Sequence, residues 1–125
     1  MTKFMFTLMA AGFVALFSGC ASVSEAPAEM LHSQKIGPGQ TVAHLEATNW
    51  GIYLFSIPLL TGSVEEPGKI VVFQDTVNAG SVVSLLTAKS KELNATGTYN
   101  IVSMTMPMPF MFGIRETSVS ANVVK

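Results

Sequence analysis

Hydrophobic and polar positions alternate between residues 41 and 48, which predicts a strand with one buried and one exposed face. On the expected buried face are Ala43, Leu45 and Ala47, and on the opposite face are Val42, His44 and Glu46. The sequence Asn49-Trp50-Gly51 predicts a turn, after which the aromatic and β-branched residues 52–57 predict a second strand. Pro58 limits the pairing of that strand, and the apolar run 69–74 predicts a third, short strand.

The pattern changes to a helical period after residue 77. Asn78 predicts the N-cap of a helix, and four aliphatic residues then fall on one helical stripe: Val82, Leu85, Leu86 and Leu93. Lys89 interrupts this stripe at its edge, and Asn94 with Gly97 predicts the end of the helix. Residues 98–106 and 115–124 predict two further strands, the last with Val119, Ala121 and Val123 on its inner face.

These elements follow the order β-β-β-α-β-β, which predicts the α+β class. One helix can cover only one face of a sheet. We therefore expect a small, mainly antiparallel sheet with one packed helix, and a second sheet face that is exposed or covered by a partner. The predicted domain spans residues 36–125, because the turn sequence at residues 36–39 separates it from the small, polar segment before it.

Residues 1–19 have the composition of a targeting signal. Lys3 is followed by 14 uncharged, mostly apolar residues (4–17) and then by small residues up to Cys20. As a helix this stretch would span roughly 21 Å, which is shorter than the ~30 Å hydrocarbon core of a bilayer, so a signal peptide is favoured over a permanent transmembrane helix. Without these residues the hydrophobic fraction falls from 49% to about 45%, which is ordinary for one globular domain.

The sequence Phe17-Ser18-Gly19-Cys20 resembles the lipobox of bacterial lipoproteins, although that family usually has Leu where Phe17 stands. The resemblance implies cleavage before Cys20, acylation of its sulfur by fatty acids such as palmitate, and attachment to the cell membrane. Ala21, in place of Asp, implies by the same resemblance an outer-membrane protein that faces the periplasm, in a cell with two membranes. The alternative is a secretory signal cut elsewhere, which would leave Cys20 as a free thiol.

After cleavage, residues 20–35 are expected to form a lipidated tether, because they are small and polar and include Pro27. Loss of Lys3 leaves 6 Lys and Arg residues against 8 Asp and Glu residues, a net charge of −2. Because the chain has no run of basic residues, nucleic acid is not expected as a partner. The acyl chains are therefore expected to carry the membrane attachment.

The most unusual segment of the expected domain is residues 104–112, which are uncharged and include Met104, Met106, Met108 and Met111. Thioethers bind soft ions such as Cu(I) and Ag(I), so one interpretation is a soft-metal or small-ligand site. A second is core packing, in which methionine fills irregular gaps. A third is a surface loop that contacts protein or lipid, because Pro107 and Pro109 prevent strand pairing. The residues of this expected contact surface are Met106, Met108, Phe110, Met111 and Phe112, together with Trp50.

The sequence contains no motif typical of an active site. His44 and Glu46 share one strand face, a pair that is far more often solvated than catalytic, and no G-x-S-x-G, Walker, H-E-x-x-H or zinc-binding motif occurs. We therefore expect a lipid-anchored envelope lipoprotein that acts as a structural or protein-interaction module, without a cofactor, and not an enzyme. The alternative is an envelope protein that binds a small ligand or a soft metal through the four methionines.

Overall fold

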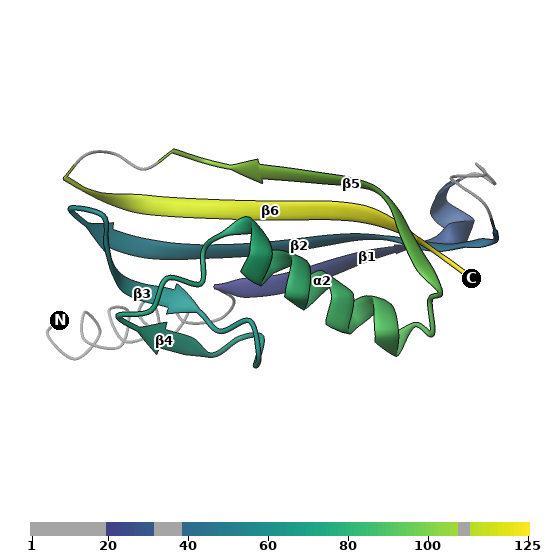
Figure 1. The fold of residues 1–125 in the computed structure, drawn as a ribbon, viewed down its shortest axis with the longest axis horizontal. Coiled ribbons are helices and arrows are strands. Elements are labelled where there is room, and N and C mark those ends of the chain that lie inside the picture. The colour runs from purple at the N-terminus through teal and green to yellow at the C-terminus, as the bar shows by residue number, and fades with distance from the viewer. Residues whose placement is uncertain (1–19, 32–38, 108–110) are drawn as a thin grey trace, which may run out of the picture.

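The computed structural model describes residues 20–31, 39–107 and 111–125, and Figure 1 shows their arrangement. In chain order the elements are β1 (Ala21–Pro27), the 3-10 helix η1 (Ala28–Leu31), β2 (Thr41–Leu54), β3 (Ile57–Gly62), β4 (Ile70–Val72), α2 (Ala79–Glu92), β5 (Gly97–Thr105) and β6 (Phe112–Val124). The strands form one antiparallel sheet, and α2 packs against it. The predicted α+β class is confirmed.

Strand β2 lies at the centre of the sheet. One of its edges pairs with β6 over residues 41–54, and its other edge pairs with β1 over residues 43–49 and with β3 over residues 51–54. Strands β1 and β3 therefore lie end to end along the same side of β2, as Figure 1 shows. Strand β4 extends the sheet beyond β3, and β5 extends it beyond β6.

The strand order differs from the predicted one because the strands predicted at residues 41–48 and 52–57 form one strand, β2, and because β1 and β3 are additional strands. Residues 21–27 belong to the expected tether, yet they pair in register with β2, from Ala21 opposite Asn49 to Pro27 opposite Ala43. Ala21 is buried and Val23 packs against the core, so these small side chains contribute to the inner face of the sheet. Residues 32–38, which complete the expected tether, lie outside the described residues.

Strand β2 continues through Asn49, Trp50 and Gly51, so the turn predicted there is wrong. Asn49 is fully buried, and its side-chain Nδ2 donates hydrogen bonds to the backbone oxygens of Gly62 at 3.1 Å and Thr76 at 3.0 Å. A Cβ atom on Gly51 would lie 2.7 Å from the Leu60 oxygen. Asn and Gly are common in turns, but here Asn49 bonds to neighbouring backbone and Gly51 allows β3 to approach β2 closely.

The chain turns instead at Phe55 and Ser56, which connect β2 to β3. Both residues have positive φ angles, +47° and +67°, as the two central residues of a type I′ turn require. Asn and Gly are the usual residues at these positions, and a bulky aromatic residue is disfavoured there. This explains why the sequence pattern does not reveal the turn.

Helix α2 begins and packs as its sequence predicts. The Asn78 side chain accepts a hydrogen bond from the Ser81 N–H at 2.9 Å, which confirms the N-cap. The predicted stripe faces the sheet, with Leu93 partly buried at its end. The buried core between helix and sheet consists of Ala21, Ala43, Leu45, Ala47, Val82, Leu85, Leu86, Val119, Ala121 and Val123.

The remaining strands are shifted relative to the prediction. Strand β4 is only three residues long, because Phe73 adopts a positive φ angle of +56° after it. Strand β6 begins at Phe112, three residues before the predicted start, and pairs with β5 through a bulge between Tyr99 and Val102. Phe112 therefore belongs to a strand and not to the preceding loop.

Candidate functional site

The two faces of the sheet differ in what covers them. Helix α2 packs on one face, here called the inner face, which carries the buried residues of β2 and β6. Helix α2, the α-helix of the described ranges, lies on that face alone, and the opposite face is here called the outer face. Its residues are the alternate positions of each strand, which include Ile52 and Leu54 of β2 and Phe112 and Ile114 of β6.

The outer face is apolar at one end of the sheet. The strand register aligns Val72, Leu60, Ile52 and Ile114 in one row across β4, β3, β2 and β6. A second row, nearer the Phe55–Ser56 turn, contains Ile57, Leu54 and Phe112. We call these two rows, together with Trp50 and Met106 of the next row, the apolar face. The opposite end of the outer face is more polar: it carries His44, Glu46, Ser118, Ser120 and Asn122, together with the exposed Met104 and Val102 of β5, which pair with Ser118 and Ser120.

Many side chains of the apolar face are accessible to solvent. The exposed fraction is 58% for Ile114, 61% for Phe112 and 53% for Met106, whereas the aliphatic residues of the inner face are buried. Scattered exposed hydrophobic residues are normal on protein surfaces, but a contiguous apolar patch with a polar neighbour tends to mark a contact site. The apolar face is therefore the candidate functional site.

The structure places most of the expected contact residues at this end of the sheet. Met106, Met111 and Phe112 are exposed, and Trp50 lies partly exposed on the outer face, whereas residues 108–110, which include Met108 and Phe110, lie outside the described residues. The β2–β3 turn is close to the end of the methionine segment, because the Phe55 N–H donates a hydrogen bond to the Met111 oxygen at 2.8 Å. The sequence pattern does not single out Leu60, Val72 and Ile114, because only strand pairing aligns them with Ile52, in the row next to Trp50.

Cys20 lies at the border of the apolar face. Its backbone oxygen accepts a hydrogen bond from the Trp50 N–H at 2.9 Å, and β1 begins at the next residue. The Cys20 side chain is 3% exposed in the full chain, and burial raises the pKa of its thiol. The same row contains Glu116 and Met106, since Trp50 pairs with Glu116, whose oxygen accepts a hydrogen bond from the Met106 N–H.

A polar cluster lies on the inner face beyond the start of α2. The Tyr53 hydroxyl donates a hydrogen bond to Asp75 Oδ1 at 2.7 Å, and the Arg115 Nη1 lies 3.5 Å from Asp75 Oδ2. The guanidinium of Arg115 also lies over the Tyr53 ring, 5.9 Å from its centroid. The sequence does not reveal this cluster, because its members are far apart in the chain.

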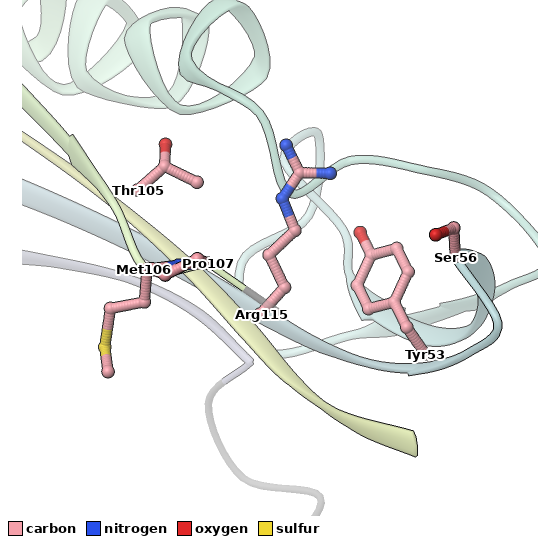
Figure 2. Close-up of a pocket in the computed structure, with 6 residues that line it drawn as sticks. All are labelled: Tyr53, Ser56, Thr105, Met106, Pro107 and Arg115. Carbon is pink, nitrogen blue, oxygen red and sulfur yellow. The ribbon is translucent and has the colours of Figure 1, made fainter. Parts of the chain in front are cut away.

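The polar cluster borders a hollow of about 230 Å³, also lined by Ser56, Thr105, Met106 and Pro107. Figure 2 shows Tyr53 and Arg115 on the helix side of the sheet, with the Met106 side chain pointing the opposite way. The hydrogen-bonding groups of the cluster find partners within it. The Asp75 carboxylate pairs with both Tyr53 and Arg115 and also accepts a hydrogen bond from the Val77 N–H at 3.2 Å. The cluster therefore has the character of a structural connection between β2, β6 and the start of the helix.

Tyr53 makes folding sensitive to alkaline pH. Burial and the hydrogen bond to Asp75 raise the pKa of the Tyr53 hydroxyl well above its ordinary value. Because the folded-state pKa exceeds the unfolded-state pKa, the stabilisation is complete below about pH 10 and is lost as the pH rises further. We predict that urea unfolding shows a fall in the free energy of unfolding above that pH, and that Tyr53→Phe reduces this fall. Tyr99→Phe is the control and should retain it; equal pH dependence in the wild type and Tyr53→Phe would contradict the prediction.

The other candidate side chains are not gathered into a reactive site. His44 lies on the outer face, and its Nδ1 is 2.8 Å from Asn122 Oδ1; Glu46 is exposed two residues along the same strand. In the part of the chain that the structure describes, His, Cys, Asp and Glu side chains form no group that could hold a metal ion. Met104 and Met106 do share the outer face, which places their thioethers on the same side of the sheet.

Comparisons of this chain with protein-family models, with curated proteins and with solved structures found no match.

Proposed function

We propose that this chain is a lipid-anchored lipoprotein of the cell envelope, held in the outer membrane and facing the periplasm, whose domain is a structural or interaction module. The observation that carries the proposal is the position of the single cysteine. Cys20 ends a lipobox-like sequence and directly precedes β1, so the processed chain would begin where the folded sheet begins. Among the described residues, no helix has the length and apolar content needed to cross a bilayer.

Acylation of Cys20 would supply the attachment. One acyl chain binds a membrane only marginally, whereas two or more hold a protein nearly permanently. The apolar face supplies the contact surface, because its exposed side chains would gain from removal from water. In this proposal the sheet is a rigid platform, and function depends on which surface the apolar face meets.

The anchor is tested by replacing its cysteine. In bacterial cells that process lipoproteins, we expect the wild-type chain to begin at Cys20 and to carry the added mass of its acyl chains. Cys20→Ser should keep residues 1–19 and carry no acyl mass, because serine lacks the sulfur to be modified. Ser22→Ala, two residues away, is the matched control and should be processed like the wild type. Intact mass spectrometry of the membrane fraction makes the measurement, and an unmodified Cys20 in the wild type would refute the proposal.

A second candidate is a protein that binds a soft metal such as Cu(I) or Ag(I). The shared orientation of Met104 and Met106 favours it, since two thioethers on one side of a strand could approach one ion. Titration with Ag(I) should then show saturable binding that is lost in the Met104→Leu/Met106→Leu variant. Leucine preserves the apolar surface, so this variant separates metal binding from apolar contact. Absence of saturable binding to the wild-type chain would remove this candidate.

A further inference from the structure

We propose that the apolar face lies on the lipid leaflet that holds the Cys20 anchor, with the Phe55–Ser56 turn directed toward the hydrocarbon. This inference rests on the proposed lipid attachment and adds to it a defined orientation of the domain. In this orientation the sheet itself contributes to membrane binding, and the polar end of the outer face remains in water.

The position of the anchor supports this orientation. Cys20 bonds through its backbone to Trp50, and no linker separates it from β1. The attached lipid would therefore leave the protein at the border row, which contains Cys20, Trp50, Glu116 and Met106. From this row the apolar face extends along β2 as far as Leu54, a distance of about 13 Å at the usual rise per residue of a strand.

The side chains along this direction suit a lipid interface. Trp50 lies in the border row, and tryptophan is the residue type that favours the level of the lipid headgroups. Beyond it, the two rows of the apolar face contain only aliphatic and aromatic side chains. Phe55 and Met111 continue the apolar surface at the turn and are 59% and 62% exposed. The charge of Glu116 remains in the border row, at the depth of the headgroups.

The anchor also favours lipid over protein as the surface that covers the apolar face. A surface that begins one residue from an acylated cysteine is held beside the leaflet at high effective concentration, so even weak apolar contact is favoured there. The apolar face contains no Lys or Arg, and the mature chain has a net charge of −2. The contact is therefore apolar and does not depend on attraction to anionic lipids.

The single tryptophan of the chain provides the test, because Trp50 lies in the border row. The acylated protein is purified from membranes and reconstituted into phosphatidylcholine vesicles whose acyl chains are either plain or brominated at their headgroup end, next to the depth expected for Trp50. Bromine quenches tryptophan only at close range, so we expect the brominated vesicles to remove most of the Trp50 fluorescence. Raising the salt concentration should leave this loss unchanged.

Variants show which surface causes the quenching. The double variant Phe112→Ser/Ile114→Ser should retain its acyl chains but lose much of the quenching, since it makes the apolar face polar. Met30→Ser is the matched control: Met30 is 70% exposed but lies in η1, away from the apolar face, and its replacement should leave the quenching unchanged. Circular dichroism verifies the fold of each variant, and the wild-type measurement requires no substitution.

The outcomes separate this inference from the anchor. If mass spectrometry shows acylation while Trp50 is equally bright in both kinds of vesicle, the docking is refuted and the anchor stands. If Trp50 is quenched while Cys20 is unmodified, the anchor is refuted, and only the contact between the apolar face and lipid stands. If crosslinking shows that the apolar faces of two copies, or of one copy and another protein, cover each other in the vesicles, the assignment to lipid is refuted.

Discussion

Leu45→Ala is expected to lower the free energy of unfolding by about 2–5 kcal/mol, the range for removing a buried leucine side chain. Leu45 lies in β2 on the inner face, is fully buried, and belongs to the core cluster with Leu85 and Val119. The loss combines the transfer free energy of the deleted methyl groups with the cost of a cavity that a rigid sheet cannot close. Because natural domains are stable by only about 5–15 kcal/mol, this single change threatens folding.

Leu54→Ala is the matched control, because Leu54 lies in the same strand on the opposite face. Its side chain is 38% exposed, so we expect a loss of about 1 kcal/mol or less. Urea unfolding monitored by circular dichroism measures both variants. Leu54→Ala should instead weaken the quenching of Trp50 by brominated lipids. Equal losses of stability in the two variants would show that the outer face is as covered as the inner one.

Gly62→Ala is expected to destabilise the domain by about 1–3 kcal/mol, the usual cost of adding an atom where there is no space. An added Cβ atom would lie 2.6 Å from the Ala21 nitrogen and 2.6 Å from the Cys20 carbonyl carbon, and would also overlap the Asn49 side chain. Two of these neighbours are backbone atoms of the segment that leads into β1. We therefore expect β1 to loosen first, with faster hydrogen exchange of its amides.

Gly80→Ala provides the control for Gly62→Ala. The nearest atom to a Cβ on Gly80 is Asn78 Oδ1 at 3.4 Å, an ordinary contact, and Gly80 lies in the first turn of α2. Alanine favours helix over glycine, so this variant should gain about 0.4–1 kcal/mol. The free energy of unfolding, measured by urea unfolding, should thus fall in Gly62→Ala and rise in Gly80→Ala. A neutral Gly62→Ala would show that β1 is not held closely against the end of β3.

Elements with strong local signals could be predicted from the sequence. The N-cap at Asn78 depends on atoms only three residues apart, and the inner faces of β2 and β6 follow from the alternation of their side chains. The turn at Phe55 and Ser56 could not be predicted in this way, because both residues are unusual at positive φ angles. Similarly, Asn49 and Gly51 have turn chemistry but are buried by neighbours from β3 and the loop after β4.

The candidate site was only partly predictable. The sequence indicates that residues 104–112 and Trp50 are unusually apolar, but it does not indicate that Ile52 would stand between Leu60 and Ile114. These alignments depend on strand register, which long-range pairing decides. The same applies to β1, whose small and polar residues carry a weak local signal and gain their strand structure from the free edge of β2.

By itself the sequence determines the local properties of this protein: the lipobox-like segment, the single cysteine, the amphipathic helix and the alternation of its main strands. Only the tertiary structure decides that Cys20 lies beside Trp50 and that an apolar face begins there. The physical reason is that one helix covers only one face of the sheet. Burial against this helix requires apolar residues at the inner positions, which the sequence pattern shows, whereas the neighbours of each outer residue depend on which strands pair and in which register.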